Sequence, residues 1–203
     1  PDGLNTIYDY DGLNNLTGLH SPDTGDTTYT YDSAGNRVTQ TDARNVTSTY
    51  TYDALNRLVT IAYPTTAKNL SFSYDQPDSI TGCIGSYAVG RLTRMTDETG
   101  TTTYCYDRRG NILRKVQVTA LDTLTLTYAW TLADRLASIT YPSGRIISYS
   151  RNGIGQITSV TMQPSAGATV EVLISSASYY PFGPLNVLTY GNGRSLAKTY
   201  DGD

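Results

Sequence analysis

Residues 28–48 read TYTYDSAGNRVTQTDARNVTS, and residues 49–60 repeat the beginning of this stretch as TYTYDALNRLVT. Before each Asp, Tyr alternates with Thr, which is a period of two in residues that favour β-strands. Successive side chains of a strand point to opposite faces, so the Tyr rings share one face and the Thr side chains the other. Each copy is therefore predicted to begin with a strand, and the Asp is predicted to end it.

A tight turn is expected after each of these strands. Four residues separate Asp32 from its Arg, but only three separate Asp53 from its Arg, so the two turns are predicted to differ in length. Aligned by residue type, Asn36-Arg37 corresponds to Asn56-Arg57. Gly and Asn are the residues that best tolerate a positive φ in such turns. The Asp and the Arg of each copy are expected to face each other as an exposed ion pair that contributes about 0.2–1 kcal/mol.

The end of the first strand recurs along the chain with a period of about 21 residues where nothing is inserted. The positions assigned to it are Tyr10, Tyr31, Tyr52, Tyr74, Tyr106, Trp130, Tyr149 and Tyr190. Strands of about six residues alternate with two classes of turn, and no segment has a helical period. The sequence thus predicts an all-β fold, an antiparallel meander of repeated β-hairpins. A sheet of so many strands is expected to form a curved open strip.

The repeats are predicted to form one array of about eight units over residues 1–203. Tyr200-Asp201 matches the start of another repeat, so we expect the array to be part of a longer protein. Longer segments near 76–90 and 163–180 interrupt the period and are either tolerated insertions or binding loops. Leu58 and Ile61 are spaced by three in a second strand, which indicates either a β-bulge or a Leu beneath the turn.

Composition excludes several classes of function. The net charge is −3 and the pI is near 5.0, so a phosphate-binding surface and a nucleic-acid partner are not expected. No apolar stretch reaches the length of about 18 residues that a membrane helix needs. The chain has 18 Tyr but 2 Phe, and a dry core would not favour the phenol in this way. These rings are expected to keep one end in water.

Residue types that carry chemistry are few. The recurring aspartates are interpreted as acceptors in turns and not as acid/base pairs; they are Asp11, Asp32, Asp53, Asp75 and Asp107. His20 is expected to be an exposed polar residue, without the partners of a catalytic triad or zinc site. Cys105 is interpreted as a small half-buried residue, with a bridge to Cys83 as the alternative. No cofactor, metal or catalytic residue is predicted.

The pattern Tyr-Asp-x-x-Gly-Asn-Arg-Leu at this spacing resembles the YD repeat of the Rhs (rearrangement hotspot) family. The resemblance covers essentially the whole chain and is clearest in three copies. Its signature residues are Tyr31, Asp32, Gly35, Asn36 and Arg37, then Tyr52, Asp53, Asn56 and Arg57, and finally Tyr106, Asp107, Gly110 and Asn111. It weakens where Thr131 and Ser150 replace the Asp.

The resemblance implies a non-catalytic wall segment of a hollow β-shell that encapsulates a C-terminal toxin domain. Shells of this kind occur in Rhs effectors of type VI secretion and in insecticidal toxin complexes. The implied partners are the remainder of the parent shell and the enclosed toxin polypeptide, and the implied location is secreted or cell-surface. The C-terminal core of the family, with its self-cleaving aspartates, has no counterpart here, so no catalytic residue is assigned.

Two further expectations concern partners. Columns of Tyr beside Asn and Asp could stack sugars, which makes an extracellular carbohydrate-binding or adhesion module the alternative function. In that case substitution of Tyr31 or Tyr52 by Ala would abolish glycan binding. The first and last strands of an open strip are also expected to have unpaired backbone groups. Either copies of the chain pair through these edges, or the turns near Pro22 and Pro184 shield them.

Overall fold

The computed structural model describes residues 5–181 and 183–200, which fall into two compact units of β-structure. The first unit takes the described residues of Pro1–Gln76, Ala88–Thr103 and Val118–Leu121. The second takes those of Pro77–Tyr87, Tyr104–Gln117 and Asp122–Asp203. The position expected to open another repeat, at residue 201, lies outside the described residues.

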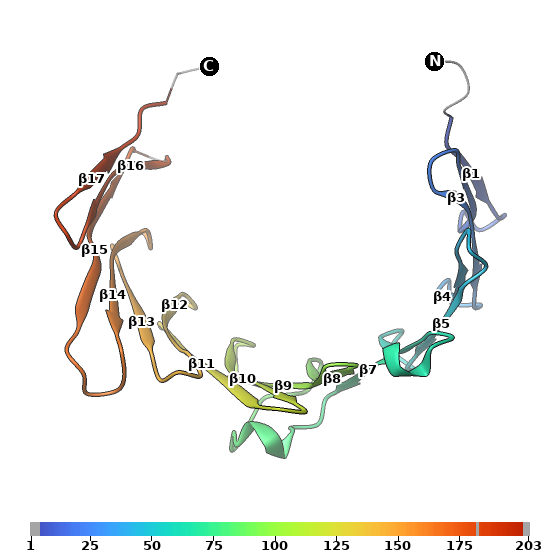
Figure 1. The fold of residues 1–203 in the computed structure, drawn as a ribbon, viewed down its shortest axis with the longest axis horizontal. Coiled ribbons are helices and arrows are strands. Elements are labelled where there is room, and N and C mark those ends of the chain that lie inside the picture. The colour runs from blue at the N-terminus through green and yellow to red at the C-terminus, as the bar shows by residue number, and fades with distance from the viewer. Residues whose placement is uncertain (1–4, 182, 201–203) are drawn as a thin grey trace. The chain divides into compact units, whose positions relative to one another are not determined.

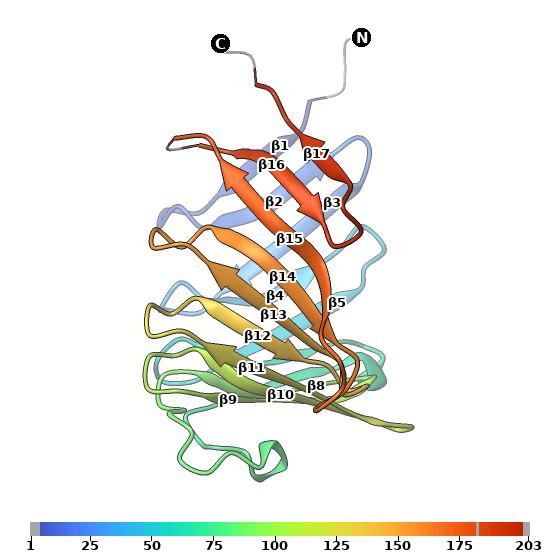
Figure 2. The ribbon, with the colours of Figure 1, turned by 90° about the vertical axis from the view of Figure 1, so that its left-hand side faces the viewer.

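Within each unit, successive strands pair antiparallel with their neighbours in the sequence (Figure 1). The first unit contains β1 (Ile7–Tyr10), β2 (Leu16–Ser21), β3 (Gly25–Tyr31), β4 (Arg37–Thr41), β5 (Thr47–Tyr52), β6 (Leu58–Ala62), β7 (Leu70–Tyr74), β8 (Leu92–Asp97) and the start of β9 (Gly100–Tyr106). The second contains the end of β9, most of β10 (Ile112–Thr119), β11 (Thr123–Trp130), β12 (Leu136–Thr140), β13 (Ile146–Arg151), β14 (Ile157–Gln163), β15 (Glu171–Tyr179), β16 (Leu185–Tyr190) and β17 (Ser195–Ala197). Figure 2 shows β11 to β15 side by side.

The prediction of an all-β antiparallel meander of repeated hairpins is confirmed. The helices in the described part of the chain are two 3₁₀ turns of 3 residues each, η1 (Thr66–Lys68) and η2 (Ser79–Thr81). Among the described residues, no helix is long and apolar enough to cross a membrane. The irregular spacing in the second strands comes from a β-bulge. Leu58 and Ile61 are opposite Tyr52 and Tyr50, so the second strand carries one extra residue there.

The same bulge recurs in the other hairpins and corrects the assignment of the last two repeats. The strand-end residue is opposite the first residue of the next strand, as Tyr31 is opposite Arg37. In the seventh hairpin this position is Arg151, opposite Ile157, and not Tyr149. In the eighth it is Tyr179, in β15, and not Tyr190, which ends β16. The segment 163–180 therefore contains a turn and the first strand of the eighth hairpin.

The two faces of the first strands differ as the alternation predicts. In β3 and β5 the Tyr side chains are half-buried, while the exposed Thr residues are Thr28, Thr30, Thr49 and Thr51. Paired hydroxyls join neighbouring strands on the Thr face, with Oγ1 of Thr30 2.5 Å from Oγ1 of Thr39. Each unit buries little: apart from glycines, the buried residues among those described are Ala88, Thr93, Thr102 and Thr103 in the first unit and Thr81, Cys105, Val116 and Val160 in the second.

The longer segment near residues 76–90 corrects the interpretation of the cysteines. Cys83 lies in it and forms a disulfide with Cys105 of β9, with Cα atoms 6.2 Å apart. The interpretation of Cys105 as a small half-buried residue without a bridge is therefore wrong, and the alternative, a bridge to Cys83, is present. Cys105 retains 1% exposure, so this part of the Thr face is not solvated as the repeat pattern predicts. The alternation of residues in a strand does not show whether an insertion elsewhere in the chain covers that strand.

Candidate functional site

The recurring feature of the fold is the hairpin turn that begins with Asp32. Its backbone N–H donates to the Asn36 carbonyl at 2.9 Å, and the Gly35 N–H donates to the Asp32 carbonyl at 3.1 Å. The Asp32 carboxylate accepts from the N–H groups of Ala34 and Asn36 and from the Asn36 amide, at 2.9, 2.8 and 3.0 Å. These bonds, first that from the Asn36 side chain, hold the pKa of Asp32 below its usual value. The aspartate is thus a turn acceptor, as predicted.

The turns that follow Asp32 and Asp53 are the same length, contrary to the alignment by residue type. Both have a residue of positive φ three positions after the Asp, which is Gly35 in one and Asn56 in the other. Gly35 therefore corresponds to Asn56, and Asn36 corresponds to Arg57. The same turn is built by Asp11, Asp107, Thr131 and Asn152, each of which accepts from the N–H four residues later. The substitution of Asp by Thr131 is tolerated because a hydroxyl can also accept.

The predicted pair of Asp and Arg across each hairpin forms in one copy and not in the other. Arg57 lies within 2.7 Å of Asp53. Arg37 comes one position later in its turn and instead lies over two rings, 4.6 Å from the centroid of Tyr50 and 5.6 Å from that of Tyr29. The letters Asn-Arg therefore occur twice in the sequence with different structural roles.

Polar side chains link several turns to the next one. In the first unit the Asn36 amide donates to the Asn56 side chain at 2.9 Å, and Arg57 donates to both carboxylate oxygens of Asp75 at 3.1 and 2.6 Å. Arg57 and the Gly90 N–H lower the pKa of Asp75 to about 2. In the second unit the Asn111 amide donates to Asp134 at 2.9 Å. The signature residues of the turns thus form a ladder along one edge of each unit.

In six repeats the strand-end side chain caps a backbone carbonyl of the preceding repeat. The hydroxyl of Tyr31 donates to the Leu16 carbonyl at 2.8 Å, where the ladder between β2 and β3 has already ended at Gly18. The same bond reaches the first residue of an even-numbered strand from Tyr52, Tyr74, Trp130, Arg151 and Tyr179. A carbonyl at a partly buried site costs about 1–3 kcal/mol if it is left without a donor. Sequence reasoning missed this role, and placed the hydroxyls in water.

His20 makes a contact that the sequence did not indicate. Its Nδ1 lies 3.0 Å from Asp26 of β3 and its Nε2 lies 2.9 Å from Asp9 of β1. These two carboxylates, first Asp26, raise the pKa of His20. The imidazole therefore joins three neighbouring strands on the face that also carries the Thr side chains. Its two nitrogens point to different carboxylates, so the three groups do not converge on one point as metal ligands do.

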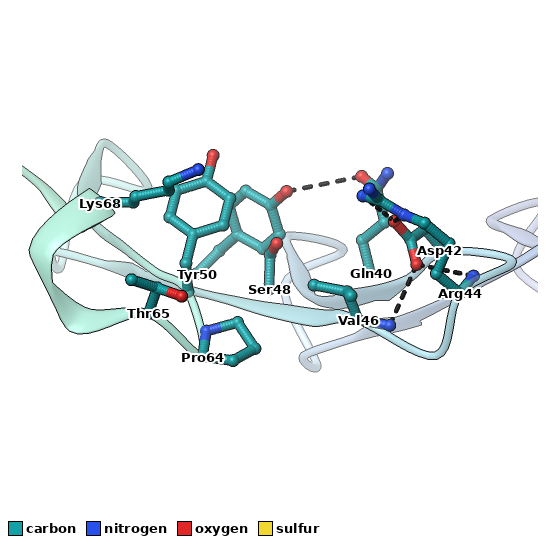
Figure 3. Close-up of a pocket in the computed structure, with 10 residues that line it drawn as sticks. Gln40, Asp42, Arg44, Val46, Ser48, Tyr50, Pro64, Thr65 and Lys68 are labelled. Carbon is teal, nitrogen blue, oxygen red and sulfur yellow. Dashed lines mark hydrogen bonds and ion pairs between the residues drawn. The ribbon is translucent and has the colours of Figure 1, made fainter.

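A cleft of about 560 Å³ opens on the Tyr face of the first unit. Figure 3 shows Pro64, Thr65 and Lys68 at one end and Asp42 with Arg44 at the other. Tyr50 and Tyr63 also line it, and the Tyr50 hydroxyl is 3.4 Å from the Gln40 side chain. Aromatic, aliphatic and hydrogen-bonding groups thus meet in one open cleft. The strand-end rings of Tyr31 and Tyr52, which were expected to stack sugars, do not line it.

Comparison with known proteins identifies the repeats. The family model described as RHS Repeat matches residues 10–47, 31–68 and 87–125. These segments contain all three copies of the signature that the sequence analysis singled out. The comparison with curated proteins gave no match.

Solved structures share the fold. The crystal structure of TcdB2-TccC3 superposes with a TM-score of 0.85 at 19% identity, over 97% of this chain and 11% of the other. The crystal structure of TcdB2-TccC3-Cdc42 gives a TM-score of 0.84 at 19% identity, over 97% and 10%. The Photorhabdus luminescens Tc holotoxin pore with a mutated TccC3 gives the same TM-score, identity and coverages. The chain therefore spans about a tenth of the length of each structure that it matches.

Proposed function

Because the chain is an array of RHS repeats, we propose that it is a non-catalytic wall segment of a shell that encloses a toxin polypeptide. The observation that carries this proposal is the use of the repeated polar side chains. The strand-end hydroxyls cap backbone carbonyls. The turn carboxylates accept hydrogen bonds within their own turn and from the neighbouring turn. The polar groups of the signature thus hold one repeat to the next, which is what a wall requires.

The proposed partners are the rest of the parent shell and the enclosed toxin, in a secreted complex. The superposed structures are toxin complexes that are about ten times longer than the matched segment, which supports a place within a larger assembly. The half-buried rings of β3 and β5 suit the side that faces a cargo, because a Tyr ring offers a large apolar contact.

The decisive experiment uses the full-length parent protein. We expect the sequence downstream of the repeats to encode an Rhs core and a further domain, and we expect that domain to resist protease while the repeats are intact. Protease should degrade the same domain when it is expressed alone. A parent without such a downstream region, or a downstream domain that is cleaved equally fast in both forms, would contradict the proposal.

A carbohydrate-binding or adhesion module is a second candidate function, which the comparisons do not favour. One observation keeps it testable: the cleft places the Tyr50 and Tyr63 rings beside Gln40 and Lys68, and such a combination suits a sugar. Titration with a panel of saccharides should then change the Tyr fluorescence of the chain. Tyr63→Ala should remove that change, whereas Tyr190→Ala, at an exposed ring outside the cleft, should leave it. No response to any saccharide would end this candidate.

A further inference from the structure

The segment Pro77–Tyr87 of the second unit is joined to β9 by the disulfide between Cys83 and Cys105. We propose that this bond is a redox-sensitive clamp, whose reduction by a dithiol releases the segment from the strands beneath it. The proposal goes beyond the shell function and does not depend on it. Cys83 and Cys105 are the two cysteines of the chain, so the bond cannot exchange for another within the chain.

Hydrophobic burial does little to hold the segment in place. The apolar side chains that it carries point outward, with exposed fractions of 44% for Ile80, 104% for Ile84 and 53% for Tyr87. Its most buried residue is Thr81, at 1% exposure. Because apolar area removed from water is the main favourable term in folding, a segment with its apolar groups outside gains little by remaining on the sheet. Figure 2 shows this part of the chain in green, including η2.

Polar contacts orient the segment on the strands. The Tyr106 backbone carbonyl accepts a hydrogen bond from the Tyr87 N–H, and the Tyr106 backbone N–H donates one to the Ser86 hydroxyl, both at 3.1 Å. The Arg114 side chain donates to the Thr81 carbonyl at 2.8 Å. Each of these groups can bond to water instead, so such bonds contribute little net stability. The covalent link is therefore the contact whose loss changes the population of the released state most.

The reduction is a two-electron thiol–disulfide exchange. A thiolate of the dithiol attacks the sulfur of Cys83, because Cys83 is half-buried whereas Cys105 is 1% exposed. The bond to Cys105 breaks and its sulfur leaves as a thiolate, which takes up a proton. The second thiol of the reagent then attacks the mixed disulfide, closes a cyclic disulfide and frees the Cys83 thiol. The two cysteines are reduced and the dithiol is oxidised.

Limited proteolysis of the whole chain with chymotrypsin tests the clamp, with cleavage sites mapped by mass spectrometry. We expect dithiothreitol to speed cleavage after Tyr87 by at least about tenfold, because cleavage follows the population of the released state. Tyr190 and Tyr200 are exposed tyrosines of the same unit that Pro does not follow, and their cleavage rates should not change. The double variant Cys83→Ser/Cys105→Ser should behave without reductant as the reduced chain does.

Three results would overturn the proposal. Thiol titration could detect two free thiols before reduction, in which case there is no clamp. Cleavage after Tyr87 could proceed at the same rate when both thiols are shown to be free, in which case the polar contacts hold the segment. Reduction could also accelerate cleavage equally at Tyr190 and Tyr200, and the disulfide would then hold the whole unit together and not one segment.

Discussion

At the scale of single residues, the hydroxyl of the strand-end Tyr explains an unusual composition. The chain has 18 Tyr and 2 Phe, and the capping bonds of Tyr31, Tyr52 and Tyr74 need a donor that Phe lacks. The alternation of Tyr with Thr predicted correctly which face the rings share. It could not predict the acceptor, because the carbonyl that each hydroxyl reaches lies about 15 residues earlier and belongs to the ladder geometry of another hairpin.

The capping bond predicts a specific loss of stability. Tyr52→Phe should lower the free energy of unfolding by about 1–2 kcal/mol, because the Arg37 carbonyl would lose its donor at a partly buried site. Tyr50→Phe is a matched control in the same strand, since the Tyr50 hydroxyl has a 3.4 Å contact with a side chain and should cost less. Urea unfolding of both variants measures the difference. Equal losses would show that the hydroxyl cap does not support the fold.

His20 predicts a pH dependence that a single resonance can report, because the chain contains one His. Its pKa is raised by Asp26 and then by Asp9, so the pKa in the folded state lies above the unfolded value of about 6.5. The stabilisation is therefore fully present below the unfolded pKa and is lost as the pH rises through the folded pKa.

NMR titration of the imidazole checks this prediction. The midpoint of the native chain should lie above that of the urea-unfolded chain, and Asp26→Asn should lower it more than Asp9→Asn. A native midpoint at or below the unfolded one would mean that the contacts of 3.0 and 2.9 Å do not form in solution.

At the scale of the element, the turn shows why an alignment of two repeats by residue type alone is wrong. Asn36 and Asn56 are the same residue type, but φ is positive at Gly35 and Asn56. Gly and Asn both tolerate this conformation, so either can occupy the position and the letters shift by one. Counting from the Asp gives the correct alignment, because in both turns the carboxylate accepts from the N–H four residues later.

The equivalence of Gly35 and Asn56 makes a prediction about substitutions. The φ of Gly35 is 82° and the nearest atom to an added Cβ would be 3.9 Å away, so a side chain there meets conformational strain and not a clash. Gly35→Ala should therefore lower the free energy of unfolding by about 1–2 kcal/mol. Gly35→Asn should cost clearly less, because Asn56 already adopts this conformation in the next turn.

Thermal and urea unfolding of the two variants test this order. The reverse order, with Asn more destabilising than Ala, would contradict the equivalence of the turns. Asn56→Gly is the reciprocal variant: Gly populates positive φ freely, so any loss of stability measures the bond that the Asn56 side chain accepts from the Asn36 amide.

At the scale of the whole molecule, periodicity predicted the fold class and the family, and it did so because each repeat uses the same local contacts. The departures from the period were harder to interpret. The bridge from Cys83 to Cys105 spans 22 residues and joins an insertion to a strand, and a spacing of one pair of cysteines does not distinguish a bridge from two free thiols. The eighth repeat was misplaced because its strand-end Tyr179 is followed by Tyr180 and not by Asp.

The terminal strand carries the last prediction. β1 pairs with β2, and all four of its residues are exposed, with Ile7, Tyr8 and Tyr10 each more than half exposed. A strand that is paired along one side can add a strand of another molecule along its other side. We therefore expect the isolated chain to associate as its concentration rises from micromolar toward millimolar.

The double variant Ile7→Lys/Tyr8→Lys should weaken this association, because charged side chains on an edge strand oppose pairing between copies. Size-exclusion chromatography with light scattering measures both chains, and Leu55→Lys, at an exposed turn residue away from β1, controls for added charge. A strict monomer at every concentration, together with slow amide exchange in β1, would show that the outer side of this strand is already satisfied within one chain.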